Sequence, residues 1–208
     1  MEADFFDYFD ERTGEFRQVW CPVRAVCLLL LLTVPIRSLQ ARLLDSGEAD
    51  EEIYDQESGT WSPNLGLLVT PKRQFGVFRK IYDTPQERSF VGLHVTTNKT
   101  AAVTSANFEK GYDIPWDCPE IAPHLERLIN WQKEFNPIKR LVNRRDFADT
   151  RLHPNEALQN ISVYSLLFRD PASRGTHSDE PLTSARLRNF FLRLLEEAQR
   201  RLNEAGEE

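Results

Sequence analysis

The sequence has few cysteines and no long hydrophobic run. The first argues against a disulfide-rich or zinc-binding protein, and the second against a membrane-spanning one. Three cysteines are an odd number without C-x-x-C spacing, which argues against a disulfide framework and against a zinc site. The most apolar stretch, residues 25–34, is about half as long as a helix that spans a bilayer. The chain also opens on acidic residues, whereas a secretory signal has a basic start. We therefore expect a cytoplasmic protein without a membrane partner.

Motifs for metals and nucleotides are missing as well. The sequence has no glycine-rich phosphate-binding loop, no H-E-x-x-H and no paired metal carboxylates. Its four histidines are far apart, and the acid run Asp50, Glu51 and Glu52 has the composition of a solvated loop. We expect neither a metal site nor a cofactor.

Charge is unevenly distributed along the chain, although the net charge is only −6. Residues 1–60 hold 13 acids and 5 bases, residues 72–151 hold 14 bases and 10 acids, and residues 152–208 hold 7 bases and 9 acids. The net charge argues against a protein that binds nucleic acid through its overall charge. A basic central region between acidic ends is nevertheless typical of a protein that binds an anion through one surface. Ordinary solvated surface explains the same distribution equally well.

The length of 208 residues and the 40% of hydrophobic residues predict one packed domain. Residues 1–12 are acidic and aromatic, which indicates a short helix or an adhesive tail. Apolar residues at helical spacing predict helices over residues 18–32, 35–44, 119–135 and 184–202. Near-alternating Val, Phe, Thr and Leu predict strands over residues 65–70, 75–81 and 90–97.

Two local features complete these predictions. Cys21 and Cys27 lie in an apolar stretch and should be buried, reduced thiols. The last helix has Thr183 or Ser184 as its N-cap. Its predicted buried face consists of Leu187, Phe190, Phe191, Leu194, Leu195, Ala198 and Leu202.

The segment 28–50 contains a leucine-rich helix, a tight Thr-x-Pro turn, an arginine at the start of the next helix and an acidic loop. In this order it resembles the first block of the tyrosine recombinase (phage-integrase) catalytic domain. The resemblance implies that Arg37 is the first catalytic arginine. A guanidinium offers phosphate oxygens a planar fork of donors and keeps its charge, so it could stabilise the charge on a scissile phosphate. The alternative is an ion pair with a neighbouring acid, such as Asp45 or Glu48.

The strand and turn at residues 90–99 resemble the β-hairpin that follows the arginine block in this family. The resemblance implies that Lys99 is the general acid that protonates the 5′-hydroxyl leaving group. A solvated turn lysine is the alternative. Basic residues on or beside the predicted sheet could bind DNA phosphates, although each alone is more often a plain surface charge: Lys72, Arg73, Arg79 and Lys80.

The family also needs an H-x-x-R, a further histidine or tryptophan, and a tyrosine nucleophile. His124, Arg127, His153 and Tyr164 occur in that order, as a site or by coincidence, and the family's L-G-H turn is absent. The segments 33–55, 129–139 and 165–173 look like a divergent integrase-like group of mobile elements, in which an insertion delays the H-x-x-R block. On that resemblance the chain is a partial or remnant catalytic domain that stops before its nucleophile.

The predicted elements give a predominantly helical α+β fold, and the resemblance implies that it is similar to DNA breaking-rejoining enzymes. An acidic-aromatic segment at 1–16 precedes a partial catalytic domain at 17–208, in which helices at 17–45 and a helical insert at 117–208 flank a small antiparallel sheet at 52–100.

The implied function is site-specific recombination and integration on double-stranded DNA, without a cofactor. A second copy or other recombinase subunits are the implied protein partners. Two alternatives remain: a non-catalytic interaction module or accessory protein of a mobile element, and an α+β protein without DNA affinity.

Overall fold

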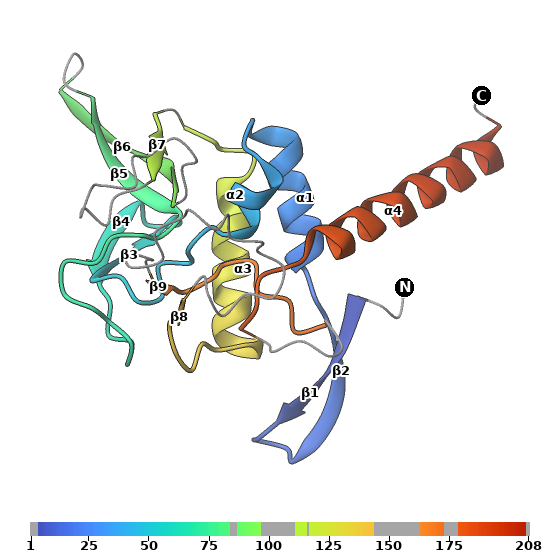
Figure 1. Cartoon of the computed structure of the whole chain (residues 1–208), viewed down its shortest axis with the longest axis horizontal. Coiled ribbons are helices and arrows are strands. Elements are labelled where there is room, and N and C mark those ends of the chain that lie inside the picture. Colours follow the sequence, from blue (N-terminus) through green and yellow to red (C-terminus); the bar gives the residue numbers. More distant parts are fainter. Residues whose placement is uncertain are drawn as a thin grey trace, which may run out of the picture.

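The computed structural model describes residues 4–83, 87–96, 111–115, 117–143, 163–172 and 179–206. Within these ranges, four helices alternate with nine strands, which form four small antiparallel sheets (Figure 1). The expected fold class was therefore wrong. Strands contribute nearly as many residues as helices, and the elements do not form the arrangement of a DNA breaking-rejoining enzyme.

The acidic-aromatic start forms a β-hairpin, so the predicted helix or tail was wrong. β1 (Phe5–Asp10) pairs with β2 (Glu15–Trp20) along its whole length. Gly14 closes the turn at φ +71°, a conformation that side chains other than glycine rarely adopt. The hairpin runs across residue 16, where the sequence placed a domain boundary.

One face of this hairpin packs on α3 (Ala122–Phe135). The rings of Phe6 and Trp131 meet edge to face at 5.8 Å, and those of Tyr8 and Phe135 at 5.2 Å. Edge-to-face pairs of this kind add to the stability that burial alone provides. The hairpin is thus joined to a helix more than 100 residues away in the sequence, and α3 itself was predicted correctly.

α1 (Val23–Thr33) is the buried leucine-rich helix expected here, although it starts five residues later. α2 (Ser38–Arg42) is half as long as predicted. Thr33 is the last residue of α1, and Arg37 directly precedes α2. Residues 34–37, with extended backbone at Val34 and Arg37, therefore separate α1 from this short helix.

The thiol prediction is confirmed. Cys21 and Cys27 are buried and unpaired. Burial raises the pKa of each thiol to about 12, so both stay protonated at neutral pH. They contribute to packing, in a core shared by α1, α3 and the central sheet.

The central strands form a two-stranded hairpin and a three-stranded sheet with the order β5-β6-β7. Their bounds are β3 (Glu52–Asp55), β4 (Thr60–Pro63), β5 (Phe78–Asp83), β6 (Arg88–Val95) and β7 (Tyr112–Ile114). β5 and β6 correspond to two predicted strands. The predicted strand at 65–70 was wrong, because this segment forms turns that leave Leu65 and Leu67 exposed.

The last helix, α4 (Ser184–Ala205), was predicted almost residue for residue. The Thr183 hydroxyl accepts a hydrogen bond from the Arg186 amide at 3.3 Å, as an N-cap should. The predicted buried face was too long, because only Leu187 and Phe190 are buried, where α4 packs on α1. The rest of α4 projects away from the body (Figure 1).

The acidic loop at residues 45–50 lies at the centre of the fold. The prediction of a solvated acid run was wrong for Asp50, which is buried, whereas Glu51 and Glu52 are exposed as predicted. The Asp45 carbonyl accepts the Val77 amide at 2.9 Å, and the Ser46 amide donates to the Ser165 carbonyl at 2.7 Å. These bonds place the loop between the start of β5 and the segment after β9 (Val163–Tyr164), which pairs with β8 (Val142–Asn143).

Candidate nucleic-acid interface

Arg37 is exposed at the junction of α1 and α2. Its backbone amide donates to the Gln40 side-chain oxygen at 3.1 Å, which fixes the turn that carries it. Within the described part of the chain, no hydrogen bond or ion pair engages its guanidinium. The charge of Arg37 is therefore available to an anion from outside.

The alternative partners of Arg37 are occupied by other cations. Asp45 forms an ion pair with Arg73, and the Glu48 carboxylate accepts two bonds from Arg169, at 2.7 and 3.1 Å. Asp45 is fully buried, so Arg37 at the surface does not reach it. The pairing of Arg37 with Asp45 or Glu48 is not formed.

The buried charges around Asp45 form a network that fixes the acidic loop at residues 45–50. Arg73, one of the predicted DNA-binding residues, is buried, with its guanidinium 3.2 Å from Asp50 and stacked over Phe75 at 4.5 Å. Burial raises the pKa of Asp45, and the Arg73 charge opposes this shift. Asp50 also accepts the Gly76 amide at 2.6 Å. Arg73 thus stabilises the fold.

Arg79 and Lys80 are neighbours on β5, so their side chains point to opposite faces of the sheet. Arg79 lies 3.3 Å from the His94 Nδ1 and 3.5 Å from Asp113, and His94 lies 2.6 Å from Asp113. Burial, followed by Arg79, lowers the pKa of His94, and Asp113 opposes them. This cluster was missed because β6 and β7 bring its members together only in the fold.

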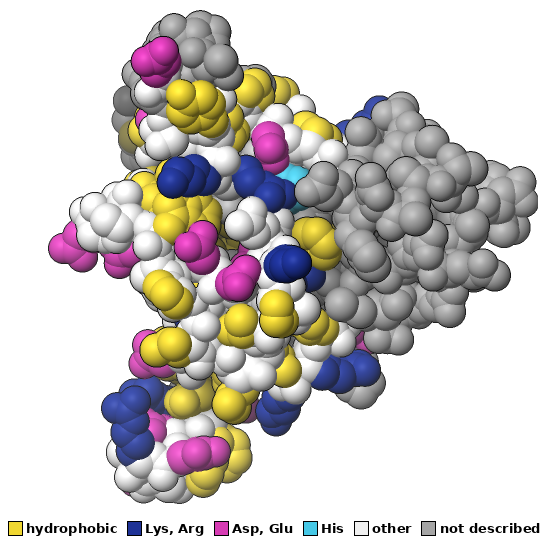
Figure 2. Space-filling view, turned by 90° about the vertical axis from the view of Figure 1, so that its left-hand side faces the viewer, with side chains coloured by type: hydrophobic (Ala, Val, Ile, Leu, Met, Phe, Trp, Pro, Cys, Tyr) yellow, Lys and Arg dark blue, Asp and Glu magenta, His cyan; other side chains and the backbone are white. Residues whose placement is uncertain are grey.

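Lys72 and Lys80 are exposed, and no described residue pairs with their ammonium groups. Figure 2 shows that Lys and Arg side chains on the face of the molecule that it displays stand singly, with carboxylates and apolar side chains between them. The described cations of this face therefore form separate contact points and not one continuous basic patch.

The structure does not bring the other predicted catalytic residues together with Arg37 among the residues that it describes. Lys99 and His153 are outside the described residues, and of Tyr164 only the backbone is described, in β9 opposite Val142. His124 and Arg127 lie on α3, where His124 is half-buried and Arg127 is exposed. No described contact joins these two residues to Arg37.

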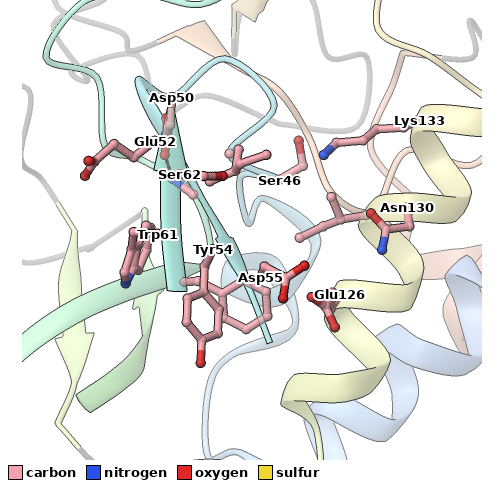
Figure 3. Close-up of a pocket in the computed structure, with 15 residues that line it drawn as sticks. Ser46, Asp50, Glu52, Tyr54, Asp55, Trp61, Ser62, Glu126, Asn130 and Lys133 are labelled. Carbon is pink, nitrogen blue, oxygen red and sulfur yellow. Dashed lines mark hydrogen bonds between the residues drawn. The ribbon is translucent and has the colours of Figure 1, made fainter. Parts of the chain in front are cut away.

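A pocket of about 150 Å³ lies between the β3–β4 hairpin, the acidic loop at residues 45–50 and α3 (Figure 3). Asp55 from β3 and Glu126 from α3 lie on the same side of it, and Lys133 lies further along α3. Its charged lining residues are four carboxylates, Asp50, Glu52, Asp55 and Glu126, and Lys133. An acidic lining repels phosphate, so this pocket is a poor site for a DNA backbone.

The comparison with family models identifies the class of this protein. Residues 2–144, more than half of the chain, match the family described as "Putative integrase". The chain therefore belongs to this integrase family. Its function is related to integration, and DNA is the indicated partner. The expected integrase-like family is thus confirmed.

Other comparisons add no relatives, since no curated protein and no solved structure matches the chain significantly. In the described ranges, no helix has both the length and the apolar character to cross a bilayer.

Proposed function

We propose that this integrase-family chain acts on double-stranded DNA in the manner of a tyrosine recombinase, with Arg37 on the scissile phosphate. The observation that carries the proposal is the state of Arg37. Its guanidinium is exposed and unpaired among the described residues, while Asp45 and Glu48 are bound to Arg73 and Arg169. A guanidinium without an internal partner can donate its planar fork of N–H groups to phosphate oxygens.

Lys99 is the proposed general acid. It follows the last residue of β6, Val95, by four positions, in the segment that the resemblance assigns to the leaving group. Its role is to give a proton to the 5′-oxygen as the phosphodiester bond breaks. Tyr164 occupies a position in the chain order that is compatible with the family's nucleophile, which would form the 3′-phosphotyrosine link, whereas the resemblance to a partial domain implies that this chain lacks its nucleophile.

Backbone contacts outside the scissile phosphate are assigned to Lys72 and Lys80, which are both exposed. Arg79 is left out because it pairs with Asp113 and its side chain is only 17% exposed. Arg73 leaves the set because Asp45 and Asp50 already neutralise it. Such contacts position the duplex and carry no sequence information.

DNA binding can be tested by fluorescence anisotropy with a labelled duplex across a salt series. Arg37→Ala should weaken binding and reduce the slope of log K against log salt by about 1, because one phosphate contact is lost. Arg12→Ala is the matched control, since it removes one exposed positive charge from the β1–β2 turn. Equal effects of the two substitutions would contradict a specific role for Arg37.

Catalysis can be tested separately with a suicide DNA substrate that traps a covalent protein–DNA adduct. A partial domain should bind the DNA without forming this adduct. An adduct that is lost with Tyr164→Phe and forms more slowly with Lys99→Ala would show that the chain contains its own nucleophile. DNA binding without any adduct would limit this chain to holding DNA, which is the accessory role left open by the sequence.

A further inference from the structure

The outer side of the β1–β2 hairpin is an exposed aromatic surface. In the register of the hairpin, Phe5 faces Trp20 and Phe9 faces Phe16, so all four rings lie on the side opposite α3. We call this surface the aromatic face. Its side chains are 39% to 73% exposed, and Phe9 and Phe16 contact each other at 5.0 Å. A cluster of this kind on a described surface marks an interaction site.

A second apolar surface continues along α4. Phe191, Leu194, Leu195 and Leu202 follow Leu187 and Phe190 on one side of the helix, at spacings of three and four residues. We call the four exposed residues the helix stripe. They are 38% to 49% exposed, because α4 packs on α1 only in its first two turns.

These two surfaces originate at the same corner of the molecule. Asp4, just before β1, accepts bonds from Arg24 of α1 at 2.8 Å and from Arg193 of α4 at 2.9 Å. From this point the hairpin and α4 extend in diverging directions (Figure 1). Because they diverge, the helix stripe does not cover the aromatic face of its own chain.

Their charges are complementary. Residues 4–20 contain five acids and two arginines, whereas α4 contains five arginines and three glutamates. Asp7 lies on the aromatic face between Phe5 and Phe9 and is exposed. A nucleic acid would meet repulsion from the acids of the hairpin, whereas a helix with apolar and arginine side chains would meet attraction.

We infer that two copies of this chain form a dimer by reciprocal exchange, in which the helix stripe of each copy covers the aromatic face of the other. The two contacts are related by a two-fold axis, so each surface is used once in each copy. At complete coverage of these side chains, each contact would remove at most roughly 700–800 Å² from water and the pair roughly 1,500 Å², which reaches the range of stable interfaces.

Sedimentation velocity of the full chain across a dilution series tests this dimer. We expect a dimer for the unmodified chain. Leu194→Asp with Leu195→Asp in the helix stripe, and Phe9→Ser with Phe16→Ser in the aromatic face, should each raise the dimer Kd by at least about tenfold. Leu192→Asp is the control, because Leu192 is 42% exposed on α4 but lies off the stripe.

Mixing the two double variants distinguishes the exchange from other dimers. Each variant keeps the surface that the other has lost, so the mixture should form a heterodimer that is weaker than the unmodified dimer but stronger than either variant alone. Circular dichroism spectra identical to the unmodified chain confirm that the substituted chains are folded.

Three results would overturn the inference. One is an unmodified chain that is monomeric throughout the series. Another is a Phe9→Ser, Phe16→Ser variant that dimerises normally, which would indicate a pair of α4 helices. The last is a mixture that associates no more than the separate variants do. The measured quantity is mass and not DNA binding, so this result is independent of the proposed function.

Discussion

At the scale of single residues, the surroundings of His94 predict how stability depends on pH. Burial and Arg79 lower the pKa of His94 below 6.5, and Asp113 only partly opposes them. The unfolded chain therefore binds the histidine proton more readily than the folded chain between the lowered value and 6.5. By linkage, this group removes stability as the pH falls through that window.

We expect His94→Gln to remove this contribution. Urea unfolding between about pH 7 and pH 5 should show a shallower acid-side loss of stability in the variant than in the unmodified chain. Asp113→Asn should steepen the loss, because it removes the carboxylate that favours the charged imidazole. Parallel pH curves for all three proteins would contradict the assignment.

Residues of the candidate site were predictable only where the signal is local. The exposure of Arg37 follows from its place at a turn between two helices. The burial of Arg73 does not, because it depends on Asp45, which is 28 positions away in the sequence. In the same way, Glu48 meets Arg169 across 121 positions. Neither acid differs in the sequence from an acid of a solvated loop.

At the scale of elements, Gly92 allows the strands of the three-stranded sheet β5-β6-β7 to pack closely. It lies in β6 between β5 and β7, and a Cβ there would come within 2.5 Å of the Ile114 carbonyl oxygen and 2.4 Å of the Ile81 side chain. The Ile81 side chain can move, but the Ile114 backbone belongs to the neighbouring strand. We expect Gly92→Ala to lower the free energy of unfolding by about 1–3 kcal/mol, measured by urea denaturation.

Gly66→Ala is the comparison for this prediction. A Cβ at Gly66 would lie 3.2 Å from the Asn64 side-chain oxygen and would otherwise make only contacts of 3.5 Å or more. The substitution should therefore cost clearly less than Gly92→Ala. Equal costs would show that the spacing between β6 and β7 does not depend on the missing Cβ.

The elements that the sequence predicted best are those with a repeating local pattern. α3 and α4 have apolar residues at helical spacing over three turns or more, together with Pro123 or Thr183 near their starts. The β1–β2 hairpin was missed because Phe5 and Phe6 are adjacent, which hides the alternation of two faces. Its inner face is defined by Trp131 and Phe135, and no local pattern points to them.

At the scale of the whole molecule, Arg24 connects segments from both ends of the chain. Its guanidinium donates to Asp4 at 2.8 Å and to Asp170 at 3.0 Å, and Asp4 also holds Arg193 of α4. The Arg24 and Asp170 side chains are only 7% and 2% exposed. The buried charge of Arg24 therefore links the β1–β2 hairpin, α1, α4 and the segment after β9.

We expect Arg24→Met to lower the free energy of unfolding by about 3–5 kcal/mol, because the substitution leaves buried carboxylates without this guanidinium. Arg193→Ala should cost about 1 kcal/mol or less, since Arg193 is 37% exposed and solvent screens its pair with Asp4. Hydrogen exchange should show protection falling together in β1 and in the first turns of α4 for Arg24→Met. Loss confined to α1 would mean that Arg24 stabilises its own helix and does not connect the ends of the molecule.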